Sequence, residues 1–236
     1  MAQRQITLPD IGEVILSKRR GSKNIRLSIN AKGQVRVGVP YWLPYGAGLT
    51  FLYSKKLWLQ KQLTAYAPST LHNGSRVGKL HTLVIHRSEP KNRLADTRVT
   101  PTTIEIRSQL EPTDPQLQKL IVKACERALK LEAEHFLPSR LSTISAANEL
   151  PFRGVRIRKL TSRWGSCSSK SDITLSIFLV QLPWELVDYV ITHELVHTKF
   201  HDHSPRFWDL LEQKLPGTRE LRHQIKLHRP RIEPLS

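Results

Sequence analysis

The sequence predicts an α+β fold, with a β-rich N-terminal region that carries one helix and a C-terminal half that packs a small antiparallel or mixed sheet on a buried helix. Three observations predict it. Short segments of alternating apolar and polar residues come first, longer segments with helical spacing follow, and 236 residues with 39% hydrophobic side chains can bury a real core. We place the boundary between an N-terminal region of residues 1–112 and a domain of residues 113–236 that ends in a basic helix.

The N-terminal region is predicted as short strands and one helix. Alternating apolar residues within 11–40 predict strands, with a turn at 30–33. Residues 49–66 carry apolar side chains at helical spacing. Trp58 and Leu59 lie on this stripe, so we expect both to pack in the core.

The remaining elements follow from the same periodicities and from proline, glycine and capping signals. In chain order we expect a turn-rich segment at 68–81, strands near 81–87, 97–99 and 103–107, a helix at 114–136, a strand at 154–160, a loop at 161–170, a strand at 172–177, and helices at 184–200, 205–214 and near 219–228, the last of them basic.

The most informative short pattern is the HExxH sequence that runs from His193 to His197. At about 100° per residue, positions i and i+4 of a helix share a face, so both imidazoles can reach one cation. Glu194 follows the first histidine and lies close enough to take a proton from water at that site. The surrounding apolar residues predict a buried helix, in which these polar groups would be costly without a metal to satisfy them. The pattern therefore predicts a zinc-dependent hydrolase, most plausibly a peptidase.

A third ligand is expected just after this helix. His201 continues the i, i+4, i+8 series, but it would lie about 12 Å along the axis from His193. Zinc–nitrogen bonds of about 2.0–2.1 Å exclude a shared ion at that separation. Ser204 is a good N-cap and Pro205 a good first helical residue, so the chain should turn at His203. We expect His203 as the third ligand, which leaves the fourth position of one Zn²⁺ open for water, as catalysis requires.

These motifs, with their neighbours, resemble a known family. The matching stretches are Arg163–Ser168, Asp172–Ser176, Leu182-Pro183, Asp188–Val190, His193–His197, His203-Ser204, Phe207-Trp208 and, in the N-terminal region, Lys18–Leu27 and Gly33–Pro40. Together they resemble the YgjP-like metallopeptidase family, which looks related to the SprT- and Wss1-type proteases. The resemblance is dense from about 155 to 215, thinner from 15 to 65, and slight between 68 and 112.

The resemblance implies a zincin-like catalytic domain that hydrolyses peptide bonds. It implies that His193, His197 and His203 bind zinc and that Glu194 is the general base. In metallopeptidases of this type a substrate often binds as an added strand, and strand 172–177 is the candidate sheet edge. No other cofactor is implied.

Three further residues are candidates for the cleft. Arg163 and Trp164 could shape it or assist electrostatically, although a surface arginine and a buried tryptophan fit equally well. Tyr189 precedes His193 by four residues on the same side of the helix and is a weaker candidate for an oxyanion donor.

Phe207 and Trp208 are expected to pack around His203 and hold it in place.

The charge of the chain indicates a polyanionic partner. There are 37 Lys and Arg against 20 Asp and Glu, a net charge of +17. An excess of this size favours non-specific contact with nucleic-acid phosphates, since no base-reading motif is visible. An uncommitted basic surface and an acidic protein partner remain alternatives. The expected partners are thus a protein or peptide substrate and, through the basic surface, nucleic acid.

Two other functions were weighed against a peptidase. A nuclease with two metal ions would need more carboxylates than Asp188, Asp202 and Asp209 supply near the motif. A basic nucleic-acid-binding module with a non-catalytic zinc site is the stronger alternative. Structural zinc sites are usually closed and rich in cysteine, which argues against it.

The expected location is the cytoplasm. The first residues contain no apolar signal core, and no apolar run is long enough to cross a membrane, so no membrane association is expected. Cys125 and Cys167 lie in different predicted elements, so a disulfide is not expected. We expect Cys167 to be a buried, inert thiol. The sequence carries no signal for an oligomeric state.

Overall fold

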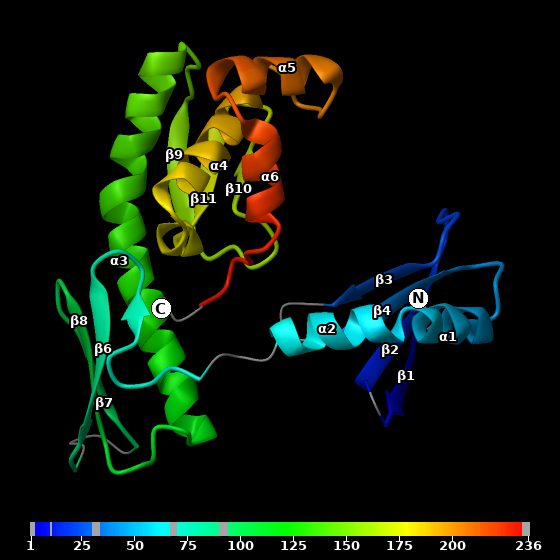
Figure 1. The fold of residues 1–236 in the computed structure, drawn as a ribbon, viewed down its shortest axis with the longest axis horizontal. Helices are drawn as coiled ribbons and strands as arrows, with labels where there is room; N and C mark the ends of the chain where they lie inside the picture. The colour runs from blue at the N-terminus through cyan, green and yellow to red at the C-terminus, as the bar shows by residue number, and fades with distance from the viewer. Residues whose placement is uncertain (1–2, 10, 30–33, 67–69, 90–93, 233–236) are drawn as a thin grey trace. The chain divides into compact units, whose positions relative to one another are not determined.

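The computed structural model describes residues 3–9, 11–29, 34–66, 70–89 and 94–232. The fold is α+β, as predicted, and its contacts divide the chain into two compact units, Met1–Pro68 and Ser69–Ser236 (Figure 1). The expected boundary after residue 112 differs from this division. The strands between residues 76 and 108 pack on the long helix that follows them, so they belong to the second unit.

The first unit combines a four-stranded sheet with two helices. Its elements are β1 (Gln3–Leu8), β2 (Gly12–Arg19), β3 (Arg26–Ile29), β4 (Val35–Pro40), α1 (Tyr45–Ser54) and α2 (Lys56–Tyr66). The strand order is β1-β2-β4-β3, with β2 parallel to β4 and the other pairs antiparallel. Side chains alternate along a strand, so the buried apolar residues of β2 and β4 lie on one face of the sheet. There they form a core with Leu52 and Leu59. The opposite face carries Arg19 and Arg36.

Three details of this unit differ from the prediction. Strand β1 was missed, and the single expected helix is divided into α1 and α2 at Lys55. Leu59 is fully buried, whereas Trp58 is 48% exposed, so its expected role in the core is wrong. Position i+1 on a helix lies about 100° from its neighbour, and one stripe cannot bury both side chains. The expected turn at 30–33 lies outside the described residues.

The second unit begins with a sheet and a helix of 34 residues. Its first elements are β5 (Arg76–Val77), β6 (His81–Arg87), β7 (Asp96–Val99), β8 (Thr103–Ser108) and α3 (Pro115–Asn148). The strand order is β5-β6-β8-β7, with β6 parallel to β8. The side chain of Asp114 caps α3 by accepting hydrogen bonds from the amides of Gln116 (2.7 Å) and Leu117 (3.3 Å).

Helix α3 continues twelve residues beyond its expected end at 136. Pro138 lies inside it, at a cost of about 3 kcal/mol for the missing hydrogen bond and the ring clash. Leu137 and Leu141 are fully buried on the same helix. Each such burial contributes about 1.5–3 kcal/mol, which offsets the proline. The helix ends at Glu149, whose backbone is left-handed (φ 56°).

The catalytic half of this unit contains a second, three-stranded sheet. Its elements are β9 (Gly154–Arg158), β10 (Gly165–Cys167), β11 (Asp172–Ser176), the 3₁₀ helix η1 (Ile177–Gln181), α4 (Trp184–Val196), α5 (Pro205–Lys214) and α6 (Thr218–Ile225). The strand order is β10-β11-β9. Strand β10 lies in the expected loop 161–170. Strand β11 pairs on both sides, so the expectation that residues 172–177 form a sheet edge is wrong, and β10 and β9 are the two edge strands of this sheet.

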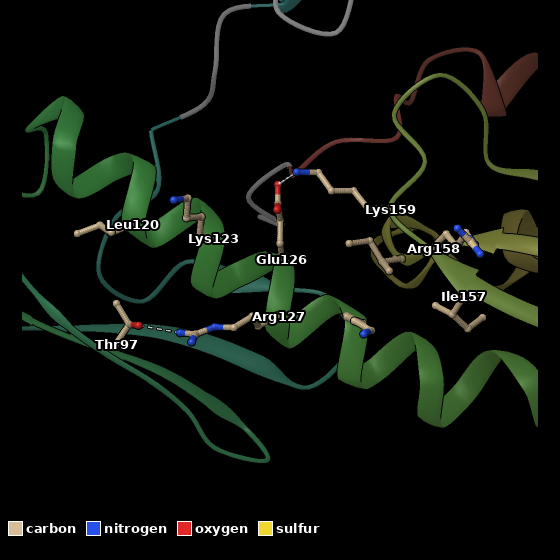
Figure 2. A pocket seen from close by; sticks show the side chains of 10 residues that line it. Thr97, Leu120, Lys123, Glu126, Arg127, Ile157, Arg158 and Lys159 are labelled. Carbon is tan, nitrogen blue, oxygen red and sulfur yellow. Dashed lines mark hydrogen bonds and ion pairs between the residues drawn. The ribbon is translucent and has the colours of Figure 1, made fainter.

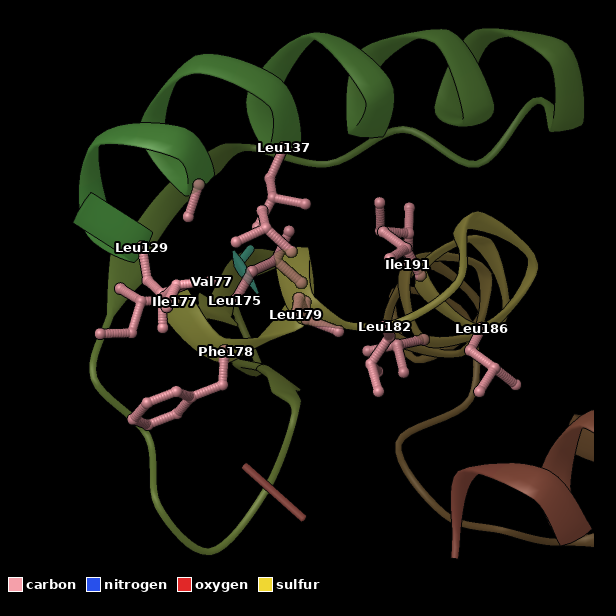
Figure 3. Close-up of a cluster of buried hydrophobic side chains, with 14 of the residues drawn as sticks. Val77, Leu129, Leu137, Leu175, Ile177, Phe178, Leu179, Leu182, Leu186 and Ile191 are labelled. Carbon is pink, nitrogen blue, oxygen red and sulfur yellow. The ribbon is translucent and has the colours of Figure 1, made fainter. Parts of the chain in front are cut away.

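Helix α4 is fixed in the unit by apolar packing and by two polar contacts. Leu129 and Leu137 of α3 face the side chains of η1, and Leu186 and Ile191 of α4 complete the cluster (Figure 3). The guanidinium of Arg140 on α3 donates two hydrogen bonds to Asp188, one of them 2.7 Å long. These contacts hold the first turns of α4 against α3, so its last turn reaches a defined position beside β10.

Both cysteines are free, as the sequence predicted. Burial raises the pKa of Cys125 to about 12. Across the part of the chain that the structure describes, no helix has the length and apolar character needed to cross a membrane.

A buried carboxylate joins α3 to the turn between β5 and β6. Glu132 accepts hydrogen bonds from the amides of Lys79 (2.5 Å), Leu80 (3.0 Å) and His81 (3.1 Å), and from Nδ1 of His81 (2.6 Å). The other ring nitrogen of His81 lies 2.9 Å from the Thr100 carbonyl oxygen. The imidazole of His81 is thus held on both sides, by the Glu132 carboxyl group and by the Thr100 carbonyl oxygen.

Replacing Glu132 with alanine should lower the free energy of unfolding by about 3–5 kcal/mol. The change leaves three amides and one ring nitrogen of His81 buried without their hydrogen-bond partner. Urea unfolding followed by circular dichroism measures the effect. Glu134→Ala, two residues along the same helix, removes only an exposed pair with Lys130 and should change stability by less than about 0.5 kcal/mol. Equal effects of the two variants would contradict the assignment.

Candidate active site

Three histidines converge at the end of helix α4. His193 lies in the last turn of α4, His197 is its C-cap, and His203 lies in the loop before α5. One ring nitrogen from each lies within 4.8 Å of the others, and Nε2 of His193 is 3.1 Å from Nε2 of His203. Tetrahedral zinc with nitrogen bonds of about 2.0–2.1 Å would place two ligand nitrogens about 3.3 Å apart. The three side chains could therefore hold one metal ion.

The protonation of the rings suits a metal. Nδ1 of His197 donates to the carbonyl oxygen of Phe200 at 2.8 Å, which leaves its Nε2 with a free lone pair. Burial, together with His197 and His203, lowers the pKa of His193 to about 3, and burial also lowers the pKa of His197. Nδ1 of His193 is buried and has no hydrogen-bond partner among the described residues. Neutral imidazoles are the form that binds a metal.

Two aromatic residues of α5 hold the cluster, as the sequence predicted. The ring of Phe207 lies 4.6–4.8 Å from the rings of all three histidines. The ring of Trp208 stacks on His203 at 5.6 Å, and its Nε1 donates to the His203 carbonyl oxygen at 3.1 Å. These contacts fix the backbone and the ring of the histidine that comes from the loop.

Glu194 is buried beside the cluster, between α4 and β10. Its exposed fraction is 6%, and a Cβ atom placed on Gly165 would lie 2.7 Å from its Cγ. Burial raises the pKa of Glu194 to about 8, and the positive charge of Arg163 opposes this rise. A carboxylate with a pKa near neutrality can both accept and release a proton.

The three candidate cleft residues line the same hollow as the histidines. Its volume is about 850 Å³, and Arg163, Trp164 and Tyr189 all contribute to its wall. Trp164 is half-buried and Arg163 is exposed. Burial raises the pKa of the Tyr189 hydroxyl, which therefore stays a hydrogen-bond donor. Cys167 also lines the hollow.

The other residues weighed from the sequence lie outside the metal cluster. His201 is exposed and reaches the hollow, but it is not among the converging nitrogens. Asp202 accepts a hydrogen bond from the amide of Ser204 at 3.2 Å, and Asp188 is paired with Arg140. Cys167 is only partly buried, so the expectation of a buried thiol is wrong in that respect, but burial still raises its pKa to about 11, which keeps the thiol protonated.

Helix α6 contributes two residues that the motif search missed. Arg222 lies 4.1 Å from the ring of Trp208, and its charge helps to lower the pKa of His193. Ile225 lines the hollow. The sequence indicated a basic helix here, but no spacing linked it to the HExxH motif, because the approach of α6 to α4 is a tertiary contact.

Replacing Gly165 with alanine should lower peptidase activity by about 10- to 100-fold. The new methyl group would displace the Glu194 carboxylate, and a misplacement of about 1 Å costs up to about 100-fold. The histidines are not touched, so metal content should stay unchanged. The measurement is kcat with a fluorogenic peptide, next to metal content. The control is Gly154→Ala in β9, where the nearest atom is Oδ1 of Asp172 at 3.2 Å. Loss of metal together with activity would contradict this explanation.

Comparison with known proteins agrees with this geometry. The model of the YgjP-like metallopeptidase domain matches residues 23–228. The chain belongs to this family. The match covers parts of both compact units, and YgjP-like metallopeptidases are hydrolases, so the chain is a metallopeptidase. No curated protein matches it.

Two solved metallopeptidase zymogens are similar to part of the chain. Abylysin from Pyrococcus abyssi is 29% identical, with 38% of this YgjP-like chain and 91% of abylysin covered and a TM-score of 0.35. Jannalysin from Methanocaldococcus jannaschii is 22% identical, with 36% and 89% covered and a TM-score of 0.33.

Proposed function

We propose that this metallopeptidase hydrolyses peptide bonds with one zinc ion bound by His193, His197 and His203, and with Glu194 as the general base. The convergence of three imidazoles beside a buried carboxylate carries the proposal. Imidazole ligands suit zinc, and three protein ligands leave one position open for chemistry. A non-catalytic zinc site would have no use for the carboxylate that lies next to it.

Each residue of the site has a separate proposed role in the reaction. Zinc, when bound, supplies a Lewis acid that polarises the substrate carbonyl and lowers the pKa of water. The Glu194 carboxylate accepts a proton from the water that attacks the carbonyl carbon. It then donates this proton to the amide nitrogen as the C–N bond breaks, which yields a carboxyl group and an amine. The positive charge of Arg163 favours the ionised form of Glu194 before the reaction. Tyr189 is the proposed donor to the developing oxyanion.

The edge of β10 is the proposed binding site for the peptide backbone. Strand β10 pairs with β11 on one side, and among the described strands nothing pairs with its other side. Gly165 of this strand lies against Glu194. A substrate added as a strand here would place its carbonyl groups near the histidines, with selectivity that depends little on side chains.

Proteins associated with nucleic acid are the proposed substrate class. The net charge of +17 supports it, because a basic enzyme accumulates at polyanions and at the proteins bound to them. The proposed location is the cytoplasm, which the two free thiols support.

The test combines metal content with proteolysis. The purified chain should contain about one equivalent of zinc and cleave casein. Chelation should abolish cleavage, and added Zn²⁺ should restore it. Cleavage that persists without metal would refute the proposal. Tight zinc binding without cleavage of casein or histone, with or without DNA, would favour a binding module.

A further inference from the structure

Positive charge is concentrated in the first unit. Residues 1–68 contain 11 Lys and Arg against 2 Asp and Glu, a net charge of +9 out of the +17 of the chain. This unit holds none of the residues of the metal cluster. More than half of the net charge therefore lies on this unit, and the proposed peptidase site does not explain that charge.

Four arginines of this unit surround one hollow of about 650 Å³ on the sheet face opposite the core. Arg19, Arg26 and Arg36 come from three neighbouring strands, and Arg20 follows β2. Gly38 lies among them, since it pairs with Ser17 of β2 and Arg26 of β3. The side chain of Arg19 lies over Gly38, with its Nε 3.6 Å from the place that a Cβ atom would take. Ser17 and Ser28 of the flanking strands also line the hollow, and the Ser28 hydroxyl donates to the Arg36 carbonyl oxygen at 3.5 Å.

Within the described part of the chain, no acidic side chain pairs with these arginines. In the described part of the first unit Glu13 is the one acidic residue, and it accepts hydrogen bonds from Gln5 and Gln34. No ion pair to Arg19, Arg26 or Arg36 occurs among the described residues. Guanidinium groups crowded without counter-charge repel one another, and a phosphate relieves this repulsion with paired hydrogen bonds.

A basic hollow of the second unit provides the contrast (Figure 2). It is lined by residues of α3, β7 and β9 and has a volume of about 690 Å³. There Lys159 is paired with Glu126 at 2.5 Å, and Arg127 donates to the hydroxyl of Thr97 at 2.7 Å (Figure 2). Several of its cations already have partners, so it is the weaker anion site. Lys123 and Arg158 line this hollow and form no ion pair with any residue that the structure describes, so they offer a matched control.

Two exposed aromatic residues follow the strand that carries Arg36 and Gly38. Tyr41 and Trp42 directly follow β4 and are 62% and 71% exposed. The guanidinium of Arg20 lies 5.4 Å from the Tyr41 ring, which places Tyr41 beside the hollow, and Trp42 is the next residue of the chain. Large aromatic side chains are usually buried, and exposed rings beside a cationic groove are the arrangement on which unpaired bases stack.

We propose that this hollow, with Tyr41 and Trp42, binds single-stranded nucleic acid. The arginines take the backbone phosphates, and the exposed rings stack on bases. Binding is independent of sequence, because the site offers no set of groups that reads base edges. Binding of nucleic acid at this hollow would explain the proposed preference for nucleic-acid-associated substrates. This binding does not depend on zinc or on peptide hydrolysis.

The test measures binding of the full chain to a fluorescent oligo-deoxythymidine of about 20 nucleotides between about 50 and 200 mM salt. Arg19→Gln with Arg36→Gln should weaken binding at least about tenfold and reduce the slope of log K against log salt by about 1.4, or about 0.7 for each lost contact. Lys123→Gln with Arg158→Gln removes the same charge and should change binding less than about twofold. Trp42→Ala should weaken binding at least about fivefold and leave heparin binding unchanged.

Three results would overturn the proposal. The first is no binding at the lowest salt, and the second is an equal loss in the two charge variants, which would indicate a diffuse electrostatic effect. The third is that Trp42→Ala leaves oligonucleotide binding unchanged, which would indicate a polyanion without bases. Zinc content and casein cleavage of the Arg19/Arg36 variant should equal those of the wild type, so a failure here is distinct from a failure of the proposed peptidase.

Discussion

Glu194→Gln is expected to lower kcat for peptide hydrolysis by about 10²- to 10⁴-fold while zinc stays bound. Glutamine has nearly the same shape as glutamate, so it fits the buried space between α4 and Gly165. Its amide cannot accept the proton of water, and the step that generates the nucleophile is lost. The three histidines are unchanged, so metal binding should not depend on this substitution.

The measurement is kcat with a fluorogenic peptide together with zinc per chain. Glu185→Gln is the matched control, since Glu185 lies on the same helix but is exposed in its first turn. It should retain wild-type activity. If Glu194→Gln keeps more than about a tenth of the wild-type activity, another group is the base. If it loses zinc, Glu194 supports the metal site instead of acting on water.

His203→Ala is expected to lower zinc affinity by more than about 100-fold and to abolish cleavage at limiting metal. Removal of a group that only supports a ligand costs about 10- to 100-fold in affinity, and removal of the ligand itself should cost more. The Nε2 atom of His203 lies 3.1 Å from that of His193, so it is placed to share an ion. His193 and His197 alone would leave two positions open.

His201→Ala tests whether this effect is specific to the ligand. His201 lies two residues away, is exposed and reaches the same hollow, but it is not part of the converging cluster. Competition with a chromogenic chelator gives the zinc affinity of both variants. We expect wild-type affinity for His201→Ala. Loss of zinc in this variant, with retention in His203→Ala, would assign the third ligand to His201.

The parts of the fold and the site that were predicted well depend on short-range patterns. The spacing of HExxH places His193 and His197 on one helix face, and Ser204 and Pro205 mark the start of α5, which places His203 beside them. Strand β6 and helix α5 have the predicted bounds, 81–87 and 205–214. Helix and strand periodicity involves residues only a few positions apart, and so does helix capping. These signals can therefore be read directly from the sequence.

The parts that were missed depend on partners that are distant in the sequence. Strand β10 has three residues, too few for a periodic signal, and it exists because it pairs with β11. Helix α3 passes Pro138 because buried leucines on both sides outweigh the lost hydrogen bond. The second unit begins at 69 because the strands before α3 pack on it.

The sequence by itself therefore determined the groups from which the proposed site is built, namely the three histidines and the neighbouring glutamate, and the basic character of the chain. Only the tertiary structure decided their setting. It placed Glu194 against Gly165, brought Arg222 of α6 to the histidines, put β10 at one edge of its sheet, and gathered four arginines around Gly38. A motif is encoded by neighbours along the chain, whereas burial, strand order and charge clustering arise when distant segments pack together.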